Sequence, residues 1–332
     1  MKLEKIETAF NQMEAAVSAL AENLELSFLE SYSETVENFN DNFQVRVIDN
    51  QPSPEVVAIL ETAYTNLKKL DLSAEEWRQV FQLVLLKGMQ KEPLQANHQL
   101  TPDSIGFLFV FLVQQLLPQE NLRLLDIASG LGNLLLTVVS NLETAGKKVT
   151  AFGVDIDETL LSVAAANTDF LKKSVAYFHQ DALQDLLVDP VDAVFGDLPI
   201  GYYPNNQKAQ EFAVGVKEGH TFAHHLLLEQ GMKYVREAGF GLFLLPTNFL
   251  ETEQGPQLKN WLAHEVYLQG MVQLPADLFT SASSRKSIVI LQKRGAEAKQ
   301  AEVLLANLGS LKNAESMTEF IEKFKDWESL NL

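Results

Sequence analysis

The feature that most constrains this chain is residues 124–133, an apolar run that ends in an acid and continues into a glycine turn and a helix. The run before Asp126 is typical of a buried strand, and apolar residues recur at helical spacing after the glycines. Gly130 and Gly132 allow a ligand to approach the backbone closely, and the free N–H groups of a helix start favour an anionic group. This order of elements predicts a nucleotide-binding site.

The spacing of the turn narrows the choice of nucleotide. A dinucleotide fingerprint requires glycine or alanine three residues after Gly132, but Leu135 stands there, which disfavours NAD. A second apolar run, residues 149–154, ends in Asp155, where an acid usually binds ribose hydroxyls. A helix cap or a solvated loop acid is the alternative interpretation of Asp155. The pattern favours an adenosyl cofactor without a pyrophosphate.

From Asp126 onward, apolar runs alternate with helical patterns, which is typical of a parallel sheet covered on both faces. We expect seven strands, near residues 122–127, 149–155, 174–179, 191–197, 240–246, 265–274 and 286–292. We expect helices near residues 132–145, 157–171, 220–237 and 255–263. The last two strands lack a helix between them, which favours an antiparallel hairpin at the sheet edge. Ligands bind where the carboxyl ends of parallel strands meet.

The fourth expected strand runs into an unusual loop, residues 195–204, with an acid, two prolines and two adjacent tyrosines around a glycine. The side chain of Asp197 and the carbonyl of Leu198 could accept hydrogen bonds from an amino group. A tyrosine could stack on a planar ring. The loop therefore favours a planar, amine-bearing substrate, and a packed turn with exposed tyrosines is the alternative.

Residues 1–92 are expected to form a separate helical domain. Apolar residues with a period of 3.5 form a seam on the first helix: Leu3, Ile6, Phe10, Met13, Val17, Leu20 and Leu24. We expect the seam to pack on a helix at residues 56–70 or 74–89, with a homodimer as the alternative. A short strand is expected at residues 43–48. Residues 93–295 would form the sheet domain, and residues 296–332 a C-terminal strand and helix extension.

The segment before the first strand carries a helix start. Asn97 and His98 precede Thr101, a plausible helix N-cap, and Pro102 then stands at the first position of an apolar helix over residues 105–117. The six histidines show no metal-ligand spacing, and His224 and His225 are adjacent, so they are expected on different helix faces.

Composition excludes several classes of protein. The chain of 332 residues has no cysteine and a net charge of −18. Disulfides and thiolate metal sites are therefore excluded, and tight binding to bulk nucleic acid is not expected. No signal peptide and no apolar run of about 20 residues is present, so we expect a soluble, cytoplasmic protein and no membrane partner. One basic cluster, expected to be a solvated strand edge, comprises Arg285, Lys286, Lys293, Arg294 and Lys299.

Together these motifs resemble class I S-adenosylmethionine-dependent methyltransferases of the N6-adenine DNA methylase group. The resemblance is greatest to the modification subunits of type I restriction-modification systems and their small stand-alone relatives, and it spans residues 97–294. It implies an α/β fold, a Rossmann-like class I methyltransferase sheet of seven mostly parallel strands, with an N-terminal all-helical domain. It also implies S-adenosyl-L-methionine as the cofactor and adenine N6 in DNA as the methyl acceptor.

The resemblance implies a role for each motif. Residues 98–102 resemble the family's phenylalanine-threonine-proline element near the cofactor's methionine, and residues 126–132 resemble its Asp-Pro-Ala-Cys-Gly-Ser-Gly loop. Asp155 resembles the ribose acid, and Asp181 the adenine-side contact. The expected cofactor site comprises Thr101, Pro102, Asp126, Ala128, Gly130, Gly132, Asn133, Asp155, Ile156, Asp181 and Ala182. The expected catalytic residues are Asp197, Leu198, Pro199, Tyr202 and Tyr203, without a metal.

Two departures from the family pattern keep alternatives open. The catalytic tetrad Asn (or Asp, Ser)-Pro-Pro-aromatic is replaced by Asp-Leu-Pro-Ile at residues 197–200, which displaces the stacking ring to Tyr202 or Tyr203. Fewer than 40 residues follow Arg294, too few for a target-recognition domain. Methylation of adenine in DNA is the leading expectation. Transfer to another amine or amide, in RNA or protein, and a cofactor-binding module without catalysis are the alternatives.

Overall fold

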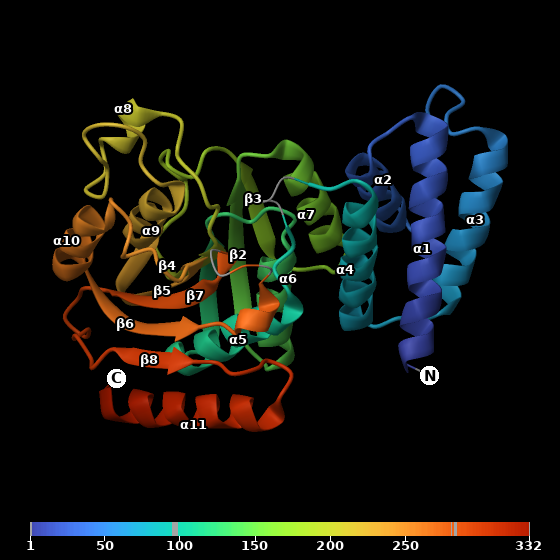
Figure 1. Ribbon diagram of the computed structural model, residues 1–332. Helices are drawn as coiled ribbons and strands as arrows, with labels where there is room; N and C mark the ends of the chain where they lie inside the picture. The colour runs from blue at the N-terminus through green and yellow to red at the C-terminus, as the bar shows by residue number, and fades with distance from the viewer. Residues whose placement is uncertain (1, 95–98, 280, 282–283, 332) are drawn as a thin grey trace.

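The computed structural model describes residues 2–94, 99–279, 281 and 284–331 (Figure 1). Within these ranges the strands form one eight-stranded sheet in the order β3-β2-β1-β4-β5-β7-β6-β8. The strands are β1 (Asn121–Asp126), β2 (Lys148–Asp155), β3 (Val175–His179), β4 (Val191–Asp197), β5 (Val235–Pro246), β6 (Val266–Gln273), β7 (Lys286–Lys293) and β8 (Leu304–Asn307). The predicted α/β class with a mostly parallel sheet is confirmed, with one strand more than the seven expected.

The last strands are arranged differently from the expected edge hairpin. β7 is antiparallel to β6, as predicted, but it lies between β5 and β6, and β8 pairs with β6 in parallel and covers the edge. The residues of β7 from Ser287 to Gln292 are all buried. A strand that is buried on both faces belongs inside a sheet, which explains the insertion.

Helices cover the sheet and connect its strands. They are α5 (Asp103–Leu116), α6 (Asn133–Thr144), α7 (Glu158–Phe170), α8 (Asn206–Ala209), α9 (Ala223–Tyr234), α10 (Gly255–Glu265) and α11 (Ala314–Asn331), with a short 3₁₀ turn, η2 (Ala276–Leu278). The four helices expected between the strands are confirmed, and α8 was not expected. None of the helices in the described ranges is long and apolar enough to cross a membrane.

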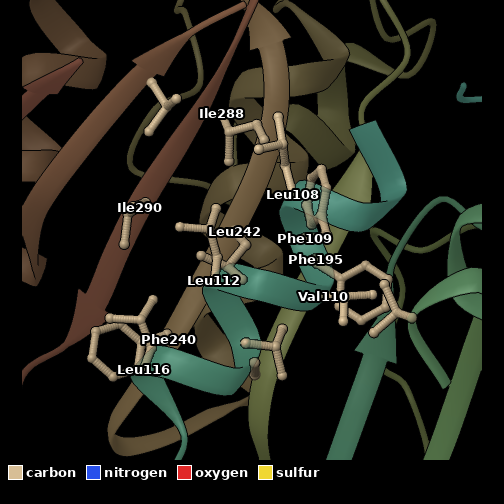
Figure 2. Packing of buried hydrophobic residues seen from close by; sticks show 14 of the residues in the cluster. Leu108, Phe109, Val110, Leu112, Leu116, Phe195, Phe240, Leu242, Ile288 and Ile290 are labelled. Atoms are coloured by element: carbon tan, nitrogen blue, oxygen red, sulfur yellow. The ribbon is translucent and has the colours of Figure 1, made fainter. Parts of the chain in front are cut away.

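Helix α5 covers one face of the sheet beside the central strands. Figure 2 shows Phe109 and Leu112 packed against side chains of β4, β5 and β7, including Phe195 and Leu242. Phe109 is fully buried, and its ring lies 6.0 Å from that of Phe195. On the other side of α5, Phe111 contacts Phe320 and Phe324 of α11. This packing fixes the first turn of α5 near the carboxyl end of β4.

Four helices precede the sheet: α1 (Lys2–Leu24), α2 (Phe28–Asn40), α3 (Pro54–Lys69) and α4 (Ala74–Lys91). The predicted seam is buried inside this group, where Met13, Val17 and Leu20 contact the other helices, whereas Leu3 is exposed. Both helices proposed as seam partners, α3 and α4, are confirmed, and α2 adds a third. A homodimer through these helices stays a prediction.

The expected strand at residues 43–48 is wrong. This segment has no ladder, and only Ile48 forms an isolated bridge, with Gln51. Asn42 and Phe43 adopt positive φ angles of 54° and 63°, which turn the chain where a strand would have to begin.

The four helices join the sheet region where α2 packs against α7 and where α4 packs against α6 (Figure 1). The hydroxyl of Tyr32 on α2 donates to Oδ1 of Asn167 on α7 at 2.9 Å. Aromatic rings of the helical region, including Trp77 and Phe81, surround Phe170 at the end of α7. The buried cluster is therefore continuous from α1 to α7.

We predict that Phe109→Ala lowers the free energy of unfolding by about 3–5 kcal/mol, because it leaves a cavity between α5 and the sheet. Phe107, two residues away on the same helix, is 46% exposed and provides the matched control. Phe107→Ala should change the unfolding free energy by less than about 0.5 kcal/mol. Urea denaturation of both variants measures the difference, and equal midpoints would contradict this packing.

Candidate active site

The predicted site residues meet at one edge of the sheet. Asp126, Asp155 and Asp197 are the last residues of the parallel strands β1, β2 and β4, which are neighbours in the order β2-β1-β4. Because these strands pair in parallel, their carboxyl ends lie at the same edge of the sheet. Asp181 follows the outer strand β3 directly after the turn at residue 180. The structure therefore brings together the acids that lay far apart in the sequence.

The two glycines of the turn have different environments. Gly132 has φ +74°, and a Cβ there would lie 2.8 Å from Cβ of Ala164 and 2.9 Å from Oη of Tyr177. Gly130 has φ +49°, but a Cβ there would meet no atom within 4 Å. Gly132 is thus required by packing against α7, whereas the space over Gly130 is open. A ligand can lie in that space.

The side chain of Asp155 forms a hydrogen bond with the backbone of the glycine turn. Its Oδ2 accepts the N–H of Gly130 at 2.7 Å, and its Oδ1 accepts the N–H of Asp157 at 3.1 Å. The alternative interpretation of Asp155 as the helix cap is wrong, because Asp157 caps α7 through the N–H of Leu160. A carboxylate can accept about four hydrogen bonds, so Asp155 retains capacity for ribose hydroxyls. Ile156 beside it is exposed.

Asp126 is the most deeply buried acid of the site, at 1% exposure. Its Oδ1 accepts the N–H of the half-buried Ala128 at 3.2 Å. Burial raises the pKa of Asp126 to about 8, and the nearby charges of Asp155 and Asp197 add to the increase. At neutral pH this side chain is therefore mainly an uncharged carboxylic acid.

Asp197 is held by two groups from other parts of the chain. Its Oδ2 accepts the hydroxyl of Thr101 at 3.0 Å, and its Oδ1 forms an ion pair with Nζ of Lys286. The loop after it is anchored by the buried side chain of Leu198, whose N–H donates to the carbonyl of Leu244, while Pro199 is half-buried. The carboxylate is thus fixed in place with lone pairs left for a substrate.

Lys286 corrects the expectation of a solvated basic strand edge. It lies opposite Pro246 at the carboxyl edge because β7 runs antiparallel to β5. Arg285 precedes Lys286 at the same end of β7 and is exposed. Lys293 and Arg294 lie at the far end, where Lys293 donates to the carbonyl of Met232 and Arg294 to that of Ala263. A lysine at the start of an antiparallel strand was the sequence signal for this partner of Asp197.

The two tyrosines of the loop occupy different positions. The hydroxyl of Tyr203 donates to Oδ2 of Asp181 at 2.5 Å, and burial together with this carboxylate raises the Tyr203 pKa above its usual value. Tyr202 is 55% exposed, and its ring stacks on Phe222 at 4.7 Å with an interplanar angle of 13°. Tyr203 therefore binds the acid that follows β3, next to the buried Ala182, and Tyr202 offers a ring surface to solvent.

Thr101 has a different role from the predicted helix cap. Helix α5 begins at Asp103, Pro102 occupies its cap position, and no side chain caps it. The hydroxyl of Thr101 is used by Asp197 instead, and its carbonyl accepts Nδ2 of Asn133 at 2.6 Å. Asn97 and His98, from the same element, lie outside the described residues.

The adjacent histidines both lie inside the protein, although consecutive positions on α9 direct them to different faces of the helix. The rings of His224 and His225 are 4.7 Å apart and nearly perpendicular, and both are buried. Helix α9 is buried at every residue from His224 to Met232, so all its faces are inside the protein. Burial lowers the pKa of His224 to about 3 and that of His225 to about 4. Both rings are neutral at physiological pH.

Comparison with known proteins agrees with this geometry. A model of the family described as N-6 DNA Methylase matches residues 80–328. The chain belongs to the N-6 DNA methylase family. A second model, the YtxK N-terminal helical domain, matches residues 7–89. The predicted resemblance is confirmed, and S-adenosylmethionine is the cofactor that membership of this family implies.

Individual relatives agree with the family model over nearly the whole chain. The uncharacterized protein YtxK of Bacillus subtilis (strain 168) is 36% identical over 332 residues, covering 98% of each chain. A crystal structure of a candidate class I S-adenosylmethionine-dependent methyltransferase from Listeria monocytogenes is 37% identical, with a TM-score of 0.89, and covers 98% of this chain and 99% of that one.

A more distant solved structure shares the fold alone. It is the type I restriction-modification methyltransferase subunit from Streptococcus thermophilus, with a TM-score of 0.67 at 15% identity. The match covers 95% of this chain and 73% of that one.

The buried acid Asp126 leads to a pH prediction. Its pKa is about 8 in the folded protein and about 4 when unfolded, so the folded state binds one more proton between these values. Its contribution to stability is therefore fully present below about pH 4 and is lost as the pH rises toward 8. We predict that Asp126→Asn raises the free energy of unfolding at pH 8 by roughly 2–4 kcal/mol and leaves it nearly unchanged at pH 4.

Urea denaturation at both pH values measures this difference. Asp189, whose side chain is 93% exposed, supplies the control, and Asp189→Asn should behave like the unmodified protein at both pH values. An Asp126→Asn variant with no gain at pH 8 would show that the acid is charged in the folded state.

Proposed function

We propose that this chain is an S-adenosylmethionine-dependent N-methyltransferase that methylates N6 of adenine in DNA, in the cytoplasm. The observation that carries the proposal is the position of Asp197, fixed between Thr101 and Lys286 at the same sheet edge as the glycine turn, where the space over Gly130 is open. An acceptor held rigidly next to a nucleotide site is what transfer of a methyl group to an amine requires.

The residues of the glycine turn fit the cofactor. Open space over Gly130, free acceptor capacity on Asp155 and the exposed Ile156 together suit the adenosyl part of the molecule. Asp181 and Ala182 lie on the side where the resemblance puts its base. When bound, S-adenosylmethionine supplies a methyl group on a positively charged sulfur.

The substrate side of the site is built by the loop after β4. Asp197 and the carbonyl of Leu198 accept the N–H bonds of the amine and orient its lone pair toward the cofactor. Pro199 keeps this short segment rigid, and the exposed ring of Tyr202 stacks on the base. Transfer would form the new C–N bond as the S–CH3 bond of the cofactor breaks, and the carboxylate of Asp197 would be available to accept the proton that the amine loses. Orientation supplies most of the rate, so neither a nucleophile nor a metal is needed.

A second candidate substrate is an amine or amide of protein or RNA. It is favoured by the net charge of −18 and by the split of the basic cluster, which leaves no shared cationic surface among its described residues for a phosphate backbone. Ile200 in place of the family's aromatic residue also favours a cofactor-binding module without catalysis. We further propose the division into residues 1–92, 93–295 and 296–332, with self-association, where it occurs, through the first of these.

One experiment separates these possibilities. The protein is titrated with S-adenosylmethionine by calorimetry and then incubated with the methyl-labelled cofactor and DNA, RNA or lysate protein. Label in adenine of DNA supports the proposal, and label in another pool identifies the alternative acceptor. Binding of the cofactor without transfer of label to any pool would support the alternative of a cofactor-binding module without catalysis.

We predict that Asp155→Ala weakens the binding of S-adenosylmethionine about 10- to 100-fold, because the ribose loses its acceptors and Gly130 loses its side-chain partner. Asp155→Asn keeps an oxygen for the N–H of Gly130 and should lose less affinity. Calorimetry on both variants measures the effect. Unchanged affinity in Asp155→Ala would remove this residue from the cofactor site.

We predict that Asp197→Ala reduces the rate of methyl transfer at least about 100-fold, while the affinity for S-adenosylmethionine stays within a few-fold. The side chain acts on the amine in the transition state, not on the cofactor. Asp197→Asn keeps one acceptor and should retain measurable transfer. Equal loss of cofactor binding and transfer in Asp197→Ala would instead place this residue in the cofactor site.

A further inference from the structure

Arg78 is the residue through which the N-terminal helices reach the candidate site. It lies on α4, is 4% exposed, and directs its guanidinium toward the first turns of α5 and α6. Nη1 and Nη2 donate to the two carboxylate oxygens of Asp103 at 2.9 and 3.0 Å, and Nη1 also donates to the hydroxyl of Thr137 at 3.0 Å. This bidentate geometry fixes both the distance and the orientation of the partner.

The partners of Arg78 lead directly to Asp197. Asp103 is the first residue of α5 and stands two residues after Thr101, whose hydroxyl donates to Asp197. Thr137 lies one turn after Asn133, whose side chain donates to the carbonyl of Thr101. Arg78 therefore clamps the two helix starts that hold Thr101 from both sides.

The contact between α5 and α6 is as close as the backbone allows at this point. A Cβ on Gly106 would lie 2.8 Å from the methyl carbon of Thr137. The two helices consequently cannot approach further, and a displacement of α5 along its axis would be transmitted to Thr101. A short, rigid path links the guanidinium to the catalytic loop.

Glu75 is a second carboxylate partner of Arg78. Its carboxylate oxygens accept from Nε and Nη2 at 2.8 Å each, and it is 36% exposed. Removing both partners of a buried ion pair often costs little stability, whereas removing one partner is costly. Stability alone therefore does not explain an arginine with two carboxylates at this position.

We propose that Arg78 is a positioning residue, by which the N-terminal helices set the place of Thr101 against Asp197 and so the geometry of the methyl-transfer site. The expected effect on cofactor binding rests on the proposed function. The role of Arg78 in holding the start of α5 does not depend on that function. The helical region then acts as part of the catalytic unit and not only as a packing surface.

The test compares Arg78→Met with the double variant Arg78→Met/Asp103→Asn. We expect Arg78→Met to unfold more easily, to exchange the amide protons of Ile105 and Gly106 faster, and to bind S-adenosylmethionine about 10-fold more weakly. Both amides donate to the carbonyl of Pro102 in the intact protein. The double variant should regain part of the stability, since Asp103 no longer carries a charge without its partner and Glu75 is 36% exposed, but it should keep the fast exchange and weak binding.

Two controls make the result decisive. Lys91→Met removes an exposed ion pair with Glu14 on the same helix and should change neither exchange nor affinity. Arg78→Lys keeps a donor group for Asp103 and should therefore restore part of the slow amide exchange and part of the affinity for S-adenosylmethionine. A double variant that regains affinity and slow exchange together with stability would show a merely structural role and overturn the inference.

Failure of the inference is distinguishable from failure of the proposed function. If the unmodified protein does not bind S-adenosylmethionine, the proposed function fails, while amide exchange still decides whether Arg78 holds the start of α5. If exchange at Ile105 and Gly106 is the same in Arg78→Met as in the unmodified protein, the positioning role is wrong whatever the cofactor result.

Discussion

The repulsion between acids at one edge of the sheet is the constraint on which the site depends. Asp126, Asp155 and Asp197 end adjacent parallel strands and so lie at the same edge, with Asp155 and Asp197 each two residues beyond the residue that pairs with Asp126. Each is relieved in a different way: Asp126 by protonation, Asp155 by backbone N–H groups, and Asp197 by Lys286 and Thr101. Like charges this close together cannot all remain ionised without such compensation.

The antiparallel strand β7 supplies the compensating charge. In a wholly parallel sheet every strand presents its last residue at this edge, and a side chain from a strand start would lie some 20 Å away at the other end. Because β7 is reversed, its first residue, Lys286, lies at the edge beside Pro246. The reversal also explains why the basic cluster does not form a surface, since its members lie at opposite ends of one strand.

Much of the fold and part of the site could be predicted from the sequence. The strand before Asp126, the positions of the parallel strands and the glycine turn follow from local patterns of apolar and glycine residues, whereas the packing role of Gly132 against α7 does not. Contacts between distant segments could not be predicted that way, because they depend on strand order. Lys286 meets Asp197 across 89 positions of sequence, and Arg78 meets Asp103 across 25. The contact between Lys286 and Asp197 exists because β7 lies beside β5, and the local sequence of a strand does not specify its neighbours in the sheet.

The β-bridge between Tyr202 and Phe222 closes the base of the long loop formed by residues 203–221. Besides the ring stack, the N–H of Tyr203 donates to Thr221, and that of Ala223 donates to Gly201, so the two ends of the intervening excursion are joined at its base. Closing a longer or shorter excursion across such a joint costs little free energy. This segment can therefore differ between relatives in length and sequence while the strand ends at Asp126, Asp155 and Asp197 stay unaltered.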